Sequence, residues 1–190
     1  MIETPRLSMR PLRLDDIEEI ARLYGDAEVT RYLAGGVRSR ERAEAWLDAE
    51  IAFWQKHHRI GRFRVADRET GAFLGQCGLR DLDDSGEIEL GYAFISAAWG
   101  RGIATEAACA TLDFSFKNSD LEHIAGVTFV KNLASQKVLT NSGMRYIRED
   151  QFYGVDLSYF AITREEWLAR YTARGAMELD RPADENESID

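Results

Sequence analysis

One short segment, Trp99-Gly100-Arg101-Gly102-Ile103-Ala104-Thr105-Glu106, has the composition of an anion site. An apolar stretch precedes it and a helical pattern follows it, so it is expected to join a strand to a helix. Gly100 and Gly102 can adopt positive φ and let a ligand approach the backbone with no Cβ in the way. The first turn of the helix leaves about four N–H groups unpaired and carries a partial positive charge. The segment therefore predicts a diphosphate site, to which Arg101 can add charge.

The same segment has competing interpretations. A glycine-rich turn between a strand and a helix also serves simple packing, and the residues alone leave both readings open. The segment is not a Walker loop, because G-x-x-x-x-G-K-[ST] does not occur in the chain. It is not a dinucleotide fingerprint either, since Thr105 stands where a third Gly or Ala is expected. The secondary-structure elements around the segment are therefore needed to choose between a phosphate site and a structural turn.

Hydrophobic periodicity predicts those elements. The expected strands are 6–14, 62–67, 72–80, 87–95, 123–130, 145–148 and 159–163, and the expected helices begin near 15 and 39 and span 101–116, 132–142 and 165–172. Strand 87–95, the helix after it and strand 123–130 form a β-α-β unit, so those two strands should run parallel. We expect an α/β (α+β mixed-sheet) domain over residues 1–175, with about seven mostly antiparallel strands and helices on both faces. An acidic, disordered tail is expected over 176–190.

The composition limits the class of protein. The chain has 190 residues, 45% hydrophobic and 30% charged, which is typical of one globular domain. Its net charge of −9 disfavours a nucleic-acid binder, and it either reflects ordinary solubility or suits a cationic substrate such as an amine. Two cysteines make neither a disulfide framework nor a metal site. Without a membrane-length apolar stretch or a signal-peptide core, a cytoplasmic location is expected.

Three segments of the chain carry a recognisable pattern, and their order and spacing make the pattern more specific than any single segment would. They are Glu3-Thr4-Pro5-Arg6-Leu7 with Arg10-Pro11-Leu12, Glu89-Leu90-Gly91-Tyr92 with residues 99–106, and Asn132-Leu133-Ala134-Ser135 with Gly143. Together they resemble the GCN5-related N-acetyltransferase (GNAT) superfamily, and within it the RimJ/RimL subgroup. The resemblance implies the GNAT fold, with one splayed pair of parallel strands, and an enzyme that moves acetyl from acetyl-CoA directly to a primary amine. The chain departs from the superfamily pattern at Trp99, at Ser96-Ala97 and at Leu139, where many relatives carry a tyrosine that serves as an acid.

The resemblance also implies which residues hold acetyl-CoA. Backbone N–H groups of Arg101 to Thr105 would bind the pyrophosphate, and the end of strand 87–95, at Phe94 and Ile95, would pair with the pantetheine arm like an added strand. Lys137 is either a phosphate contact or a solvated helix lysine. The implied cofactor-binding residues are Phe94, Ile95, Arg101, Gly102, Ile103, Ala104, Thr105, Asn132, Ser135 and Lys137, and no metal is implied.

Acetyl transfer needs a base, because an amine arrives mostly protonated at pH 7. Glu89 is the first candidate, since it lies two residues before Gly91, where the superfamily often places its base. The competing reading is a surface carboxylate on an exposed strand face. Asp150 and Asp156 in the late loop are alternative bases.

The reaction also needs a donor for the oxyanion and an acid for the leaving thiolate. A backbone N–H at the splayed strand, of Phe94 or Ile95, would serve as the donor. Ser135 is the candidate acid because RimL-like relatives use a serine at this helix position, although a capping serine is an equal reading. Tyr153 is the reserve acid, or else a loop anchor.

The acceptor is less determined by the sequence. Trp46, Trp54, Phe152 and Tyr153 could line its pocket, although helical spacing favours the core for both tryptophans. The resemblance favours a protein or peptide N-terminus. A small amine, such as a polyamine or an aminoglycoside, is the alternative, and a non-catalytic acyl-CoA sensor is a third reading. No nucleic-acid or membrane partner is expected, and a homodimer is compatible with the resemblance.

Overall fold

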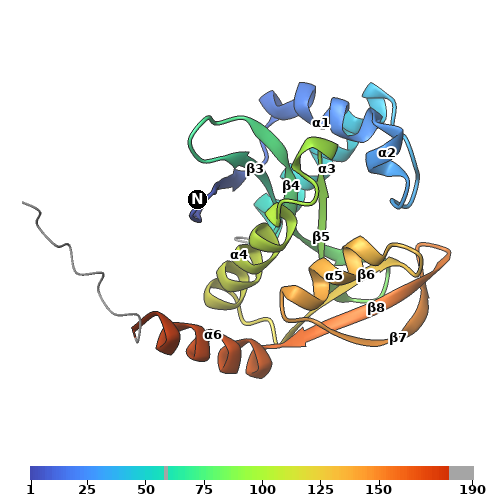
Figure 1. Cartoon of the computed structure of the whole chain (residues 1–190). Coiled ribbons are helices and arrows are strands. Elements are labelled where there is room, and N and C mark those ends of the chain that lie inside the picture. The colour runs from blue at the N-terminus through green and yellow to red at the C-terminus, as the bar shows by residue number, and fades with distance from the viewer. Residues whose placement is uncertain (58–59, 180–190) are drawn as a thin grey trace, which may run out of the picture.

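Eight strands form one sheet in the computed structural model, which describes residues 1–57 and 60–179 (Figure 1). The strands are β1 (Ile2–Glu3), β2 (Leu7–Pro11), β3 (Arg62–Asp67), β4 (Phe73–Leu82), β5 (Glu87–Phe94), β6 (His123–Phe129), β7 (Arg145–Phe152) and β8 (Val155–Thr163). They lie in the order β1-β2-β3-β4-β5-β6-β8-β7. Only β5 and β6 run parallel among these neighbours, so the expected mixed sheet with one parallel pair is confirmed. The additional strand is the short β1, which pairs with β2.

Helices cover both faces of this sheet. They are α1 (Ile17–Gly25), α2 (Ala27–Thr30), α3 (Arg40–His57), α4 (Ile103–Asn118), α5 (Leu133–Asn141) and α6 (Arg164–Leu179). The sequence did not predict the short α2, which begins where the Asp26 carboxylate accepts a hydrogen bond from the Glu28 N–H at 2.8 Å. No helix in the described ranges is long and apolar enough to span a bilayer.

The alternation of side chains along β5 explains how helices pack on both faces of the sheet. Leu90 and Phe94 point to one face and join the core that includes Leu112 and Phe116 of α4. Ala93 points to the other face and packs with residues of α1 and α3. Burial of apolar surface on both sides therefore fixes β5 at the centre of the fold.

The end of the chain differs from the sequence expectation. β7 and β8 are longer than the expected strands at 145–148 and 159–163, because a tight turn at Tyr153-Gly154 pairs them along their full length. α6 continues to Leu179, so the first four residues of the expected tail at 176–190 are helical. Residues 180–190 lie outside the described residues.

The parallel pair separates soon after it forms. Glu89 opposite Ala125 is the one register pair between β5 and β6 in the described part of the sheet. Beyond it β5 stays paired with β4, whereas β6 stays paired with β8. Figure 1 shows β5 following β4 toward α1–α3 while β6 remains beside β8. This divergence leaves one edge of β5 without a neighbouring strand.

Candidate active site

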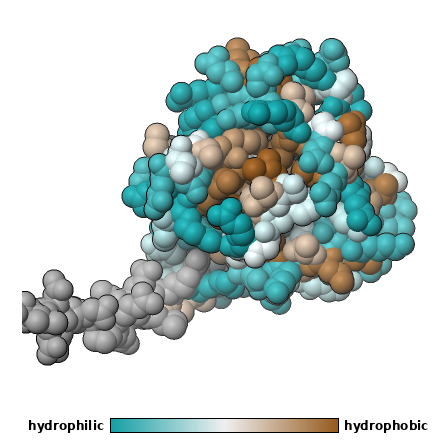
Figure 2. Space-filling view, turned by 45° about the horizontal axis from the view of Figure 1, so that its top comes forward, coloured by the Kyte–Doolittle hydropathy of each residue, from teal (hydrophilic) through white to brown (hydrophobic). Residues whose placement is uncertain are grey.

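A cleft of about 490 Å³ lies where β5 and β6 diverge. It reaches both faces of the sheet, because its walls include Tyr24 and Trp46 from α1 and α3 as well as Asn132 and Ser135 from the start of α5. On the face seen in Figure 2, apolar residues gather near the centre and hydrophilic residues surround them. The cleft can therefore receive one molecule from each side of the sheet and bring their reacting groups together between the strands.

The glycine-rich turn before α4 is open to this cleft. Gly102 caps α4 in the left-handed conformation, with φ 75°, and the Glu106 N–H makes an early intrahelical bond to its carbonyl at 3.1 Å. The N–H groups of the first turn precede that bond. A Cβ added at Gly100 would meet no atom within 4 Å, and Gly100 and Ala104 both line the cleft. The turn is thus not filled by its own side chains, and it suits a diphosphate.

The N-terminal segment holds this turn in place through contacts that were not predicted from the sequence. The Glu106 carboxylate accepts hydrogen bonds from the Thr4 hydroxyl at 2.6 Å and from Arg6 Nε at 2.6 Å. Arg6 Nη1 also donates to the Arg101 carbonyl at 2.8 Å. Burial raises the pKa of Glu106, but the hydrogen bonds from Thr4 and Arg6 outweigh it and lower the pKa below its usual value. Glu106 is therefore an ionised carboxylate whose charge is compensated before any phosphate arrives.

Along β5, the structure separates Phe94 from Ile95. The Ile95 N–H donates to the Leu74 carbonyl at 2.9 Å, and the Ile95 side chain lines a second, separate hollow. The expectation that Ile95 supplies the oxyanion donor is therefore wrong, because β4 already uses its N–H. The alternation of an antiparallel ladder turns the Phe94 N–H to the opposite edge, toward β6, and Phe94 lines the cleft.

The residues at the start of α5 form a small hydrogen-bonded group. The Ser135 Oγ lies 2.8 Å from the Tyr92 hydroxyl oxygen, and that hydroxyl donates to the Ser135 carbonyl at 3.1 Å. Asn132 caps the helix by accepting from the Ser135 N–H at 3.2 Å. Burial raises the pKa of Tyr92, so its hydroxyl stays protonated. Lys137 is exposed on the same helix.

Sequence reasoning missed Tyr92, which lies on the face of β5 opposite to Glu89. The signal was available, because side-chain alternation along Glu89-Leu90-Gly91-Tyr92 turns Tyr92 toward the helices that follow β5. Leu139 stands at the position where the resemblance implied a tyrosine that serves as the acid. It is 1% exposed and packs in the core. Tyr92 thus supplies a hydroxyl on the α5 side of the cleft.

Glu89 is a buried carboxylate and not a surface one. It is 7% exposed, and its Oε1 accepts a hydrogen bond from the Tyr153 hydroxyl at 2.7 Å. Burial raises the pKa of Glu89, against the opposing effects of the Arg62 charge and the Tyr153 hydrogen bond. A carboxylate with a raised pKa inside a cleft is suited to accept a proton near neutral pH.

Tyr153 is placed with Glu89. Its side chain comes from the β7–β8 turn, where its own φ is 55°. The Tyr153 N–H donates to the Asp83 carboxylate at 2.7 Å, and its hydroxyl accepts from the Asp83 N–H at 3.0 Å. Tyr153 therefore connects the β7–β8 hairpin to the β4–β5 hairpin, as the loop-anchor interpretation predicted. It also holds the Glu89 carboxylate in position.

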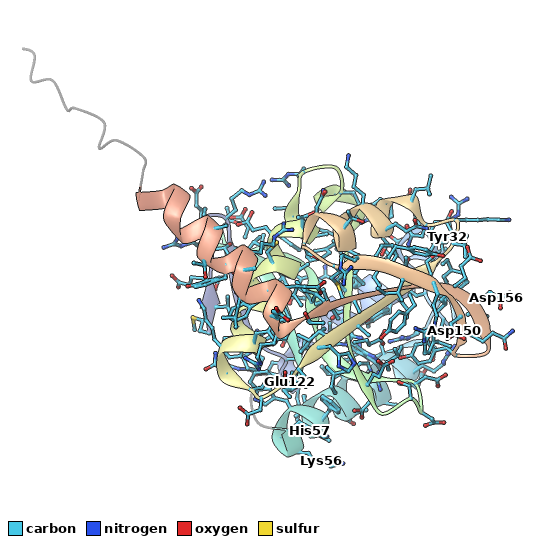
Figure 3. All side chains as sticks on the ribbon, turned by 90° about the horizontal axis from the view of Figure 1, so that it is seen from below. Tyr32, Lys56, His57, Glu122, Asp150 and Asp156 are labelled. Carbon is cyan, nitrogen blue, oxygen red and sulfur yellow. The ribbon has the colours of Figure 1, made fainter. Side chains whose placement is uncertain are left out.

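The alternative bases and two of the aromatic candidates lie elsewhere. Asp150 is exposed and pairs with Arg148 at 2.9 Å, and Asp156 accepts from Gln151 at 3.1 Å. Figure 3 labels both on the β7–β8 side of the molecule, and neither lines the cleft. Tyr153 and Trp46 line the cleft, although helical spacing favoured the core for Trp46. Trp54 packs against Phe63, as that spacing favoured, and Phe152 stacks on Tyr159.

Comparison with known proteins gives a consistent picture. The family model described as an acetyltransferase (GNAT) domain matches residues 6–145. YkkB of Bacillus subtilis is 31% identical over 130 residues, which are 65% of this chain and 72% of that protein. YnaD of the same organism, described as an uncharacterised N-acetyltransferase, is 28% identical over 174 residues, which are 87% of this chain and 98% of that protein.

Solved structures share the fold at lower identity. A GNAT-family acetyltransferase from Bacillus anthracis has a TM-score of 0.73 and 24% identity, covering 86% of this chain and 98% of its own. Spermidine N-acetyltransferase from Vibrio cholerae, bound to CoA and spermine, has a TM-score of 0.72 and 19% identity, covering 87% and 99%. RimJ from Mycobacterium smegmatis, bound to a CoA disulfide, has a TM-score of 0.70 and 23% identity, covering 89% of each chain.

Proposed function

The chain belongs to the GNAT acetyltransferase family and is an N-acetyltransferase of that type, and from this premise we propose that it transfers acetyl from acetyl-CoA to the amine of a peptide or protein N-terminus. One observation carries the proposal. The cleft joins the open glycine-rich turn on one side of the sheet to the buried Glu89 carboxylate on the other. A donor and an acceptor can meet there without a covalent enzyme intermediate.

The cofactor side of the cleft fits acetyl-CoA. The N–H groups of the first turn of α4 and the exposed Arg101 would hold the diphosphate, and the free edge of β5 that precedes Phe94 would pair with the pantetheine amides. Asn132 would add a side-chain contact to the same arm. When bound, acetyl-CoA supplies a thioester whose carbonyl carbon is open to attack.

On the acceptor side, Glu89 accepts the proton that the amine must lose. The neutral nitrogen then forms a bond to the thioester carbon, and the carbon–sulfur bond breaks. The Phe94 N–H stabilises the negative oxygen of the tetrahedral species. Ser135 donates its hydroxyl proton to the leaving sulfur, and the Tyr92 hydroxyl replaces that proton. The second proton, which the nitrogen loses as the amide forms, restores the Tyr92 hydroxyl through solvent, and Glu89 releases the first proton to water. Charge and protons balance, and the products are an amide and free CoA.

The N-terminal acceptor follows the RimJ/RimL resemblance, which the fold likeness to RimJ supports without deciding the substrate. The test is release of CoA thiol from acetyl-CoA across a panel of peptides, polyamines and aminoglycosides. We expect turnover with peptides that have a free N-terminus and none with the same peptides after N-terminal acetylation. Turnover with polyamines alone would contradict the peptide assignment. Tight CoA binding without turnover on any acceptor would favour a sensor.

The contact between Tyr153 and Glu89 predicts a change in pH dependence. The Tyr153 hydroxyl stabilises the ionised Glu89 carboxylate, so Tyr153→Phe raises the Glu89 pKa further. The base must be ionised to act, and the acid limb of the kcat/KM profile should move to higher pH. Tyr159→Phe is the matched control, because that hydroxyl donates to the neighbouring Glu87 at 2.8 Å. A profile that shifts equally in both variants would remove Tyr153 from this role.

The contact between Ser135 and Tyr92 predicts a loss of turnover without loss of the cofactor. Ser135→Ala removes the acid for the leaving sulfur and should lower kcat about 100-fold while CoA affinity changes little. Tyr92→Phe should give a smaller decrease, since Ser135 keeps its own proton. Thr140→Ala, at an exposed position of the same helix, serves as the control. Unchanged kcat in Ser135→Ala would assign the acid elsewhere.

A further inference from the structure

The acceptor side of the cleft is richer in cations than the chain as a whole. The net charge of the chain is −9. Among the described residues, however, four arginines and two glutamates line the cleft: Arg31, Arg38, Arg62, Arg80, Glu28 and Glu89. A local excess of positive charge governs recognition inside a cleft more than distant surface charge does. The net charge of the whole chain therefore does not describe the charge at the site.

Two of these arginines already have a protein partner. Arg80 Nη1 donates to the Glu50 carboxylate at 2.9 Å, and Arg62 Nε lies 3.5 Å from the other oxygen of Glu50. Glu50 is 2% exposed, so this buried carboxylate offsets the two guanidinium groups that lie over it. These two side chains are therefore part of the wall.

Arg38 differs from them. Its guanidinium carbon lies 4.0 Å from the centre of the Tyr24 ring and 5.3 Å from that of Trp46. Its Nη1 atom is buried without a hydrogen-bond partner, and no carboxylate of the described chain forms an ion pair with it. A buried donor of a cation that has no acceptor costs free energy, which an arriving anion would recover.

The position of Arg38 is fixed independently of any ligand. Its backbone N–H donates to the Tyr24 carbonyl at 3.0 Å. The Tyr24 hydroxyl accepts from Gln76 Nε2 at 3.1 Å, and Gln76 Oε1 accepts from Arg62 at 3.0 Å. This chain of contacts connects Arg38 to β4, the neighbour of the strand that carries Glu89. The two groups thus lie on one continuous, rigid wall of the cleft.

We propose that the acceptor is an amine that also carries a carboxylate, with the amine at Glu89 and the carboxylate bound by Arg38. The inference rests on the proposed function and specifies its substrate class. The Arg38 guanidinium packs over Tyr24 and beside Trp46, whose rings meet edge to face, and a planar guanidinium presents its N–H groups in the geometry that a carboxylate accepts. The carboxylate can come from an acidic side chain near a peptide N-terminus or from the main-chain carboxylate of a free amino acid.

The experiment compares matched acceptors in the wild type, in Arg38→Gln and in Arg38→Lys. One pair is a peptide amide with Asp or Asn as its second residue, and the other is a free amino acid and its amide. We expect the wild type to prefer a carboxylate-bearing member by about 30- to 100-fold in kcat/KM. Arg38→Gln should lose that preference, because its kcat/KM falls far more for the carboxylate-bearing members than for the neutral ones, and Arg38→Lys should keep part of it. Arg22→Gln, which removes an exposed arginine of α1, is the control.

Each outcome of this experiment has a distinct meaning. A preference in the peptide pair identifies a peptide side chain as the source, and one in the amino acid pair alone overturns the peptide acceptor while it supports the role of Arg38. Equal use of charged and neutral members by the wild type, or equal losses in Arg38→Gln, would overturn the inference and leave the proposed function intact. If no acceptor turns over, thermal shifts with CoA and the same acceptors decide, because only the wild type should be stabilised by the carboxylate-bearing members.

Discussion

Gly102→Glu is expected to weaken CoA binding by more than about 100-fold, with the fold retained. Gly102 adopts φ 75°, which strains any residue with a Cβ, and its N–H belongs to the turn proposed to hold the diphosphate. The new carboxylate adds like charge at the N-terminus of α4, where an anion should bind. Titration calorimetry with CoA measures the loss, and circular dichroism checks the fold.

A matched substitution separates strain from charge. Gly86 adopts φ 78° in the β4–β5 turn, and a Cβ there meets no atom within 4 Å. Gly86→Glu therefore adds comparable strain and the same charge outside the cleft, and it should leave CoA affinity unchanged. Gly102→Ala introduces strain without charge and should give an intermediate affinity. CoA binding to Gly102→Glu as tight as to Gly86→Glu would show that the diphosphate lies elsewhere.

Glu89→Gln is expected to lower kcat/KM by about 100- to 10,000-fold near pH 7. The loss should shrink at high pH, where free amine becomes abundant without a base. In the wild type, burial raises the Glu89 pKa, so activity should fall as the pH drops through that raised value. The variant should lack this limb. A stopped or continuous thiol assay from acid to alkaline pH measures both profiles.

Stability provides the check that Glu89→Gln still folds. A carboxyl group with a raised pKa stabilises the fold below its ordinary pKa, and that contribution is lost as the pH rises through the raised value. The neutral glutamine avoids this loss, so the variant should melt at or above the wild-type temperature at pH 8. Glu87→Gln, on the same face of β5 but bonded to His123 and Tyr159, should keep its activity. Equal activity losses in both variants would remove Glu89 as the base.

Local sequence patterns predicted the strand, turn and helix that position the site. Periodicity identified the strand at Glu89, the turn at Gly102 and the helix that follows, because apolar spacing and glycine placement determine these elements within a few residues. The parallel pair followed from the β-α-β connection. Short elements such as β1 and α2 escaped prediction, since they depend on pairing with β2 and on a single cap at Asp26.

The contacts that specify the chemistry were harder to predict. The hydrogen bond from Tyr153 to Glu89 joins residues 64 positions apart, and that between Tyr92 and Ser135 joins residues 43 apart. Such contacts depend on which strands and helices lie side by side in the folded sheet, and the local spacing of residues does not determine that. The sequence likewise gives no indication that Arg38 Nη1 lacks a hydrogen-bond partner, because that depends on which side chains surround it in the described fold.

The bonds from Arg6 to Glu106 join positions 100 residues apart. During synthesis Arg6 leaves the ribosome long before its partner, so the glycine-rich turn proposed to hold acetyl-CoA is complete only after the first strands have docked against α4.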